Sequence, residues 1–468
     1  MAGTINSLGI GSGVLTSNII DQLKAADTAA LVTPIDSKLL LQKQKDGALS
    51  LLSSLLSTFK SSANALGDSS LYQGRTVSGS NDSVSVTASA GVAVQSFSIA
   101  NTQMALKNVK ESGSFAATTN SIATGAGSMG LTVGGVVYNI DYTASTTLED
   151  LRDSINNVAG TSVKASTLQV GANDYRLILT SAQTGANQTI SLTDSVGGAL
   201  DTKLLAYDVA TNPTGMQEIQ AARDATFQYN GITLTRSTNT ITDVTPGMTI
   251  NLLKDAGSAN ISIAQDTQAI TDSMSSFVQN YNSLTSQLTM MTTTDVAAGK
   301  VGIFNGDSTI NTITREINRL VTSVNKDGLS LAQFGIDLTE SGTMVLNSAT
   351  FTTKFKENTT LSETFFSGMT TVNSSGGTNK VDGLFTSMDT LLSNYTKSNG
   401  IMDTLTTGSA NEMKSLNENK KRAQTLLEAR YNSMSAKFAQ YDSMISRLNN
   451  QFSSLQQQIS MAVNGTNN

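Results

Sequence analysis

The sequence contains one short pattern with the spacing of a nucleophilic site. Ser57 and Lys60 have the S-x-x-K spacing of serine acyltransferases, in which a lysine activates the serine. Both lie inside a leucine-rich helical pattern, the chain has no Lys-Thr-Gly box, and the same spacing recurs at Ser323 and Lys326. The match is therefore interpreted as chance, and substituting Ser57 or Lys60 is expected to change only stability or export.

Two glycine-rich segments have the spacing of phosphate-binding loops. Gly125, Gly127 and Gly130 form a literal G-x-G-x-x-G, but a strand pattern follows where a dinucleotide site needs a helix. This segment is interpreted as a flexible loop. Residues 9–13 carry three glycines ahead of a helical pattern, but no strand pattern precedes them and no P-loop lysine follows. Flexible backbone that becomes ordered on assembly is the favoured interpretation of these glycines.

The acidic residues do not form a recognisable acid–base pair. Glu149, Asp150 and Asp153 are the densest cluster, and they fit the first turns of a helix, where Thr147 and Asp150 predict a capping box. General acid–base catalysis would need two acids in contrasting environments around one cleft. Residues 325–328 resemble a calcium loop but lack the later glutamate.

The amino-acid composition excludes further classes of catalytic and metal site. The 468 residues include no cysteine, histidine or tryptophan. Without cysteine there are no disulfides, zinc–thiolate sites or thiol nucleophiles, and without histidine the commonest general base and metal ligand is missing. We therefore predict that the protein is not an enzyme and that it binds no cofactor and no metal.

Net charge and hydropathy limit which classes of partner and which cellular locations fit the sequence. The formal net charge is −6 and the sequence pI is about 4.9, so nucleic acid and anionic membranes are poor partners. No window of about 18 apolar residues predicts a membrane span. Lys24 is the first basic residue, which argues against a Sec-type signal peptide. The expectation is a protein that stays in the cytosol or leaves by a route without cleavage.

The most regular pattern is an apolar stripe near the C-terminus. Proline and glycine are absent from 413–463, which predicts one long helix. Every seventh residue forms one row, in which only Lys420 is out of character: Met413, Lys420, Leu427, Met434, Tyr441, Leu448, Leu455 and Ala462. A second row shifts by one position near Met434, as a four-residue stutter in a heptad repeat does. A helix with one such stripe needs a partner, in this chain or in other copies.

The rest of the chain predicts a nested order of helix, β, α+β, β and helix. Helical patterns cover 19–30 and 35–66, the latter ending at Gly67 as a predicted C′ residue, and return at 266–288, 310–324 and 384–392. Strand patterns surround an Asn-Gly turn at 230–231, and a helix at 148–158 with Leu148, Leu151, Ile155 and Val158 on one face lies inside a smaller module. The predicted fold class is α+β and multidomain, with long coiled-coil-like terminal helices, a helical domain from both chain ends and two nested β-rich head domains. The predicted divisions are 1–40 with 410–468, 41–75 with 266–409, 76–107 with 216–265, and 108–215.

Several segments resemble one bacterial family. They are 5–13 (INSLGIGSG), 19–23 (IIDQL), 215–218 (GMQE), 229–231 (YNG), 238–247 (TNTITDVTPG) and 441–451 (YDSMISRLNNQ). Together they are similar to the flagellar filament cap proteins, the hook-associated protein 2 family, over nearly the full length. The 148–156 helix resembles an Ile-Asn motif shared among flagellar axial proteins. Lys24 and Ala30-Leu31 depart from the family, which often has Met and Pro-Leu there.

The resemblance implies a structural role at the tip of the flagellum. It implies a ring of copies, a pentamer by expectation, that promotes the folding and insertion of exported flagellin and prevents its leakage. It also implies an export chaperone that binds the C-terminal region, and secretion without a cleaved signal peptide. The residues predicted to contact other copies or the filament are Ile5, Leu8, Ile10, Ile19, Ile20, Leu23, Leu427, Met434, Phe438, Tyr441, Ile445, Leu448, Phe452, Leu455 and Ile459.

Two alternatives remain open at the level of sequence. A flagellin or a flagellar junction protein would share the nested layout, although its terminal motifs differ from those here. A head-mediated adhesin is the other alternative, because the resemblance implies surface binding for some family members in addition to capping.

Overall fold

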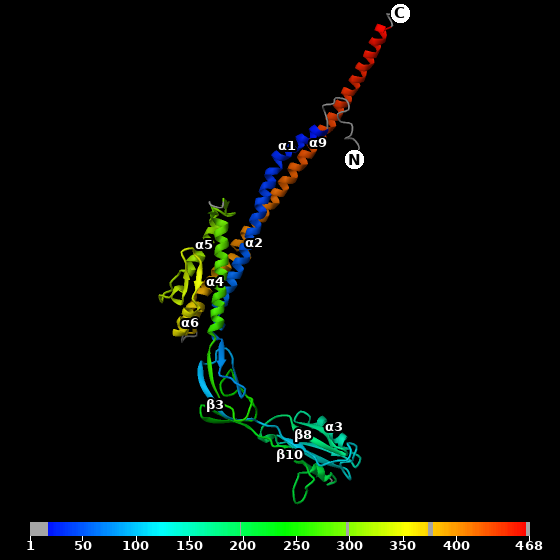
Figure 1. Cartoon of the computed structure of the whole chain (residues 1–468), viewed down its shortest axis with the longest axis vertical. Helices are drawn as coiled ribbons and strands as arrows, with labels where there is room; N and C mark the ends of the chain where they lie inside the picture. The colour runs from blue at the N-terminus through cyan, green and yellow to red at the C-terminus, as the bar shows by residue number, and fades with distance from the viewer. Residues whose placement is uncertain (1–16, 197, 296–298, 373–377, 465–468) are drawn as a thin grey trace. The chain divides into compact units, whose positions relative to one another are not determined.

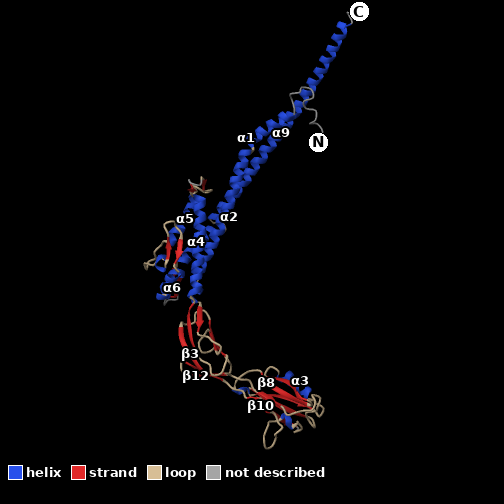
Figure 2. Ribbon diagram, in the orientation of Figure 1, coloured by secondary structure: helices blue, strands red, loops and turns tan. Residues whose placement is uncertain are grey.

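The computed structural model of the chain describes residues 17–196, 198–295, 299–372 and 378–464 (Figure 1). It divides into two compact units, residues 70–269 and the two chain ends that flank them. We call the unit built from the chain ends the helical unit and the unit of residues 70–269 the β unit. Figure 2 shows helices throughout the first and strands through most of the second. The predicted α+β class is confirmed, whereas the finer four-part division stays a prediction.

The helical unit contains long helices from both ends of the chain. Their bounds are α1 Ser17–Leu31, α2 Thr33–Gly67, α4 Thr267–Thr292, α5 Ser308–Val321, α6 Ser348–Glu357, α7 Thr359–Ser367, α8 Leu384–Thr396 and α9 Ile401–Asn464. Short hairpins β16–β17 (Thr294–Asp295, Lys300–Val301), β18–β19 (Ile336–Leu338, Met344–Leu346) and β20–β21 (Gly368–Val372, Thr378–Asp382), and the 3₁₀ turn η5 (Leu331–Phe334), lie between them. Leu49, Leu52, Leu56, Phe59 and Leu66 follow the helical period and are buried, so one face of α2 packs on α8 and α9.

Gly67 does not end α2 in the predicted way. It is the last helical residue, and the next residue, Asp68, is extended with φ −82° and ψ 114°. A left-handed C′ glycine is therefore not used here. A Cβ on Gly67 would lie 3.4 Å from the backbone nitrogen of Thr386 in α8, so the glycine permits close helix packing.

Part of the helical core was not foreseen in the sequence. Six phenylalanines from η5, α6, α7 and α8 pack together, and Phe366 at their centre is fully buried. Its ring centroid lies between 4.8 and 6.3 Å from those of Phe334, Phe351, Phe355, Phe365 and Phe385. The segment is rich in Ser and Thr and its helices have only ten and nine residues, so no long periodic pattern marks them.

The β unit begins and ends with antiparallel strands that form two sheets. One sheet has the order β1-β15-β3-β11-β12 and the other β13-β14-β2. The bounds are β1 Arg75–Ser78, β2 Val84–Ala88, β3 Gln95–Gln103, β11 Ala225–Tyr229, β12 Ile232–Arg236, β13 Thr240–Ile241, β14 Met248–Leu252 and β15 Ala259–Gln265, with the 3₁₀ turn η2 (Ser69–Gln73) before them. Alternate residues of each strand form one apolar core. Asn230 and Gly231 have φ values of 48° and 83°, which confirms the predicted two-residue hairpin turn.

The middle of the β unit holds two further sheets and one helix. The sheets have the orders β10-β4-β8-β7 and β6-β5-β9. The bounds are β4 Val109–Glu111, β5 Gly127–Val133, β6 Val136–Tyr142, α3 Leu148–Ala159, β7 Val163–Gly171, β8 Asp174–Ser181, β9 Ser191–Val196 and β10 Gln217–Gln220, with 3₁₀ turns η3 (Ala186–Gln188) and η4 (Thr202–Leu204). Leu148, Leu151 and Ile155 of α3 face the core as predicted, but Val158 is half exposed and Ala159 is buried instead.

Two local expectations in this part have opposite outcomes. Thr147 and Asp150 form the predicted capping box at the start of α3. The flexible loop predicted at Gly125–Gly130 is wrong, because β5 begins at Gly127 and runs through the segment. A Cβ on Gly127 would lie 2.2 Å from the carbonyl oxygen of Val196, so close strand packing requires this glycine.

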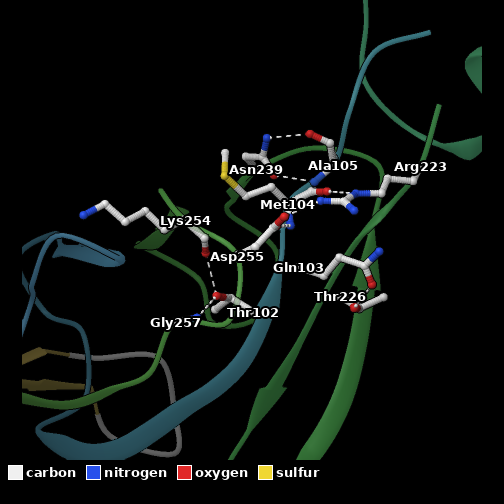
Figure 3. A network of polar contacts seen from close by, with 10 residues as sticks. All are labelled: Thr102, Gln103, Met104, Ala105, Arg223, Thr226, Asn239, Lys254, Asp255 and Gly257. Atoms are coloured by element: carbon white, nitrogen blue, oxygen red, sulfur yellow. Dashed lines mark hydrogen bonds and ion pairs between the residues drawn. The ribbon is translucent and has the colours of Figure 1, made fainter. Parts of the chain in front are cut away.

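A polar network fixes the backbone where the chain passes between the two parts of the β unit (Figure 3). The Arg223 guanidinium donates from Nε to the Met104 carbonyl at 2.9 Å and from Nη2 to Asp255 at 2.6 Å. Asp255 also accepts the Met104 N–H at 2.6 Å. The Asn239 side chain accepts a hydrogen bond from the Ala105 N–H at 2.7 Å and donates one to the Ala105 carbonyl at 2.9 Å. Three side chains from different parts of the sequence thus hold the backbone of Met104 and Ala105.

We expect Asp255→Asn to destabilise the β unit in a pH-dependent way. The pKa of Asp255 lies below its ordinary value, first because Met104 N–H donates to the carboxylate and then because Arg223 does. Since the folded pKa is the lower one, the stabilisation is present above about pH 4 and is lost as pH falls through the folded pKa. The thermal transition of the variant should be about 2–4 °C lower than that of wild type at pH 7, and the difference should be smaller at pH 3 as the wild-type carboxylate becomes protonated.

The control is Asp82→Asn, because the side chain of Asp82 is 94% exposed and lies 3.8 Å from its ion-pair partner Lys254. It should leave the transition unchanged at both pH values. A difference between Asp255→Asn and wild type that is the same at pH 7 and pH 3 would contradict the account of the network.

Candidate functional site

The first part of the C-terminal stripe packs within its own chain. Ile20, Val32, Leu427 and Tyr431 form a buried apolar cluster between α1–α2 and α9. Ala423, Met434 and Phe438 pack against it. Figure 1 shows α1 beside α9, which is the arrangement that these contacts require. This half of the stripe is therefore covered without a second copy.

Polar contacts flank the cluster and set the direction of the pairing. Asp36 forms an ion pair with Lys420 at 2.7 Å, and Asp27 forms one with Arg430 at 2.9 Å. The hydroxyl of Tyr431 donates to Asp27 at 2.7 Å, and burial together with this hydrogen bond raises the pKa of Tyr431. Residue numbers fall from 430 to 420 on α9 as they rise from 27 to 36 on α1–α2, so the paired helices are antiparallel. Lys420, the exception in the apolar row, is thus explained by Asp36.

The second part of the stripe is exposed. We call Tyr441, Ile445, Leu448, Phe452, Leu455 and Ile459 the distal seam. Their spacing alternates four and three, which places them on one face of α9. Phe452 is 72% exposed and Leu448 is 48% exposed, and Ile445 is the half-buried member. Between 438 and 464 the helix carries only Asp442 and Arg447 as charged residues. An apolar face of this length on a charge-poor helix is typical of a surface that binds another protein.

The structure brings together some of the predicted interface residues and separates others. Ile20 and Leu427 are buried in the cluster of α1 and α9, with Met434 and Phe438 packed on it. Ile19 and Leu23 are exposed on α1. Ile5, Leu8 and Ile10 lie outside the described residues. The assignment of all these residues to contacts with other chains stays a prediction.

The motifs considered for chemistry lie in ordinary structural settings. Ser57 is exposed and Lys60 is half buried on α2. Asn325 uses its side chain to accept the N–H groups of Asp327 and Leu329 within one turn. Among the described residues, no group of three or more acidic, histidine or cysteine side chains is placed to hold a metal ion. No helix in the described ranges is long and apolar enough to cross a membrane.

Comparison with known proteins identifies the family. The profile of the flagellar hook-associated protein 2 N-terminus matches residues 12–108, and that of the flagellar hook-associated protein 2 C-terminus matches residues 222–450. The two matches include the segments that form α1, α2 and most of α9. The chain belongs to the flagellar hook-associated protein 2 family. The flagellin and junction-protein alternative is therefore not favoured.

Individual relatives of the hook-associated protein 2 family agree with this. The chain is 29% identical to flagellar hook-associated protein 2 of Escherichia coli K12 over 97% of this chain and 98% of the relative. It is 32% identical to the Campylobacter jejuni protein over 67% of this chain, but the match spans only 54% of that relative. The crystal structure of the D1-D2-D3 domains of the flagellar cap protein FliD from Escherichia coli superposes with a TM-score of 0.56 and 27% identity, covering 78% of this chain and 99% of that structure.

A third profile, the flagellin hook IN motif, matches residues 128–183 of this hook-associated protein 2 family member. The predicted resemblance of the 148–156 helix to an Ile-Asn motif is thereby confirmed. Ile155 is fully buried under the sheets, and Asn156 exchanges two hydrogen bonds with the backbone of Ala165, at 2.9 and 3.0 Å. Ala165 lies in β7, which is an edge strand of its sheet. The asparagine therefore satisfies backbone groups that no neighbouring strand reaches.

We expect Asn156→Ala to destabilise the β unit by about 1–3 kcal/mol, because the N–H and carbonyl of Ala165 lose their partners in a partly buried place. Urea denaturation followed by circular dichroism measures the change. Asn157→Ala is the matched control, since Asn157 is the exposed neighbour on the same helix. Equal effects of the two substitutions would contradict the role given to Asn156.

Proposed function

We propose that this chain caps the distal end of the bacterial flagellar filament, where it promotes the folding and insertion of exported flagellin and prevents its leakage. Membership of the hook-associated protein 2 family supports the proposal. The observation that carries it is the exposed distal seam of α9. A cap must hold the filament end through a surface that is left open in the isolated chain, and this seam has the length and composition of such a surface.

The distal seam fits a helical partner. Its residues repeat with the spacing by which α-helices pack side by side in coiled coils. Complete burial of one large apolar side chain contributes about 1.5–3 kcal/mol, so the seam can supply much of the free energy of docking. We propose that its partners are other copies of this chain and the filament end.

We further propose the finer features that the family resemblance implies. Copies assemble into a ring, for which five is the expected number. An export chaperone binds the C-terminal region before secretion, and the protein reaches the flagellar tip without cleavage of a signal peptide. The protein acts by binding and shape alone, with no catalytic step. A serine-reactive probe should therefore leave Ser57 unmodified when the protein is examined by mass spectrometry.

Complementation of a strain that lacks its own cap protein tests the proposal. Cells that express this chain together with its cognate flagellin should grow filaments and retain flagellin on the cell. Cells without it should release flagellin monomers into the medium. Secretion of this chain must be measured in parallel, because a chain that stays inside the cell cannot act at the tip. A chain that is secreted and yet leaves flagellin in the medium would contradict capping.

A further inference from the structure

Charge divides α9 into two parts that differ in composition. From 414 to 437 the helix is basic, with Lys414, Lys420, Lys421, Arg422, Arg430 and Lys437 against Glu418 and Glu428. From 438 to 464 it carries one acidic and one basic residue. The helices that face the basic part are acidic between residues 17 and 36, with Asp21, Asp27 and Asp36 against Lys24.

The observed ion pairs between α9 and α1–α2 use this complementarity. Lys420 and Arg430 are the two basic residues of this part of α9 that form ion pairs with α1–α2, and their partners are Asp36 and Asp27. The Asp36–Lys420 pair lies beyond Val32 and Leu427 of the buried cluster, and the Asp27–Arg430 pair lies within the span of the cluster, beside Tyr431. Each pair is partly exposed, with side-chain exposures of 33% and 47% for the first and 60% and 31% for the second, so neither is a large source of stability.

The two ion pairs affect the register between α9 and α1–α2 more than they affect the stability of the fold. In the observed antiparallel pairing Lys420 meets Asp36 and Arg430 meets Asp27. A slip of seven residues in one direction brings Lys420 to Lys43 and Arg430 to Pro34. The opposite slip brings them to Ala29 and Ile20. Both alternatives lose both ion pairs. The first adds a repulsion between two lysines and puts Asp27 in the place of Ile20, and the second puts Ala25 in the place of Val32. Charged residues at such flanking positions are known to set partner and register in helix pairs.

We propose that Asp27, Asp36, Lys420 and Arg430 are the residues that select α1–α2 as the partner of the basic part of α9 and fix the register of the pair. Two α9 helices brought together over 414–437 would place like charges side by side, whereas the distal seam carries no such penalty. The four charges thereby leave the distal seam of α9, rather than its basic part, open to other chains. This inference concerns pairing within the chain and holds whether or not the chain caps a filament.

Charge reversal with reciprocal rescue tests the proposal. Lys420→Glu with Arg430→Glu should speed backbone hydrogen exchange in α1 at least tenfold, because a fifteen-residue helix without its partner is marginal in water. Asp27→Lys with Asp36→Lys should do the same. All four substitutions in one chain should restore slow exchange. The matched control is Lys421→Glu with Arg422→Glu, which changes the net charge equally at exposed positions with no ion pair to α1–α2 in the described structure.

Mixing the two mismatched variants separates partner selection from simple stabilisation. The α9 helix of the Lys420→Glu, Arg430→Glu variant is complementary in charge to α1–α2 of the Asp27→Lys, Asp36→Lys variant. The unchanged α1–α2 of the first variant is likewise complementary to the unchanged α9 of the second. An equimolar mixture should therefore form mixed dimers, seen by native mass spectrometry with one variant tagged, that neither variant forms alone. Mixed dimers together with rescue in the four-fold variant support the proposal. Exchange in the first variant equal to that in the control, absence of rescue, or absence of mixed dimers would each overturn it.

Discussion

Replacing Leu448 and Phe452 by aspartate is expected to abolish filament capping while the β unit stays folded. Leu448 is 48% and Phe452 is 72% exposed on the distal seam, so the isolated chain loses little buried apolar area. On docking, each aspartate would be desolvated without a partner, which costs several kcal/mol. Cells with the double variant should release flagellin into the medium and grow no filaments, although the thermal transition of the β unit is unchanged.

The matched control for this double variant is Asn450→Asp with Gln457→Asp. These residues are exposed on the opposite face of the same part of α9, and the change in charge is the same. The control should support filament growth. Intracellular and secreted amounts of each variant must be compared, because loss of an export chaperone site would also stop growth. A secreted double variant that still caps would show that the distal seam is not the docking surface.

Replacing Phe366 by alanine is expected to destabilise the helical unit by about 3–5 kcal/mol. The ring is fully buried and packs against five other phenylalanine rings, so truncation leaves a cavity that the short helices α6 and α7 cannot close. The corresponding thermal transition should fall by on the order of 10 °C. The transition of the β unit should not move, because its two apolar cores contain no residue of this cluster.

Leu361→Ala is the control for this substitution, since Leu361 lies on α7 but is 39% exposed. Its effect should be less than about 1 kcal/mol, because little apolar area is lost. Calorimetry or circular dichroism distinguishes the two units by their content of helix and strand. An equal shift in both transitions for Phe366→Ala would contradict the separate cores described here.

Local signals in the sequence predicted much of the fold. The Asn230-Gly231 turn and the capping box of Thr147 and Asp150 were found as expected, because each depends on a few neighbouring residues with one favoured geometry. The phenylalanine cluster was missed because its members come from four short elements and carry no common period. The glycines of β5 were misread as a loop for a related reason, since the close approach of Gly127 to Val196 arises only in the folded sheet.

The sequence predicted the apolar rows of α9, but it did not predict which part of them is buried within the chain and which part is exposed. The apolar rows of α9 were visible in the sequence, yet periodicity alone does not distinguish Leu427, which is buried within the chain, from Leu448, which is exposed. One signal was present: Lys420 interrupts the apolar row, and its ion-pair partner Asp36 is an acidic residue of the N-terminal helices. The distinction depends on which helix lies opposite, and that is a property of the tertiary fold.

We propose that the distal seam, and not the basic part of α9, contacts other chains, and cross-linking tests this directly. Because the chain contains no cysteine, Leu448→Cys and Gln424→Cys each introduce a single labelling site, and both positions are exposed. Each variant is labelled with a thiol-reactive photo-cross-linker and irradiated at filament ends. Cross-links from position 448 to another copy or to flagellin, with few or none from position 424, are the predicted result. Cross-links from position 424 alone, or from position 448 only within its own chain, would contradict the account.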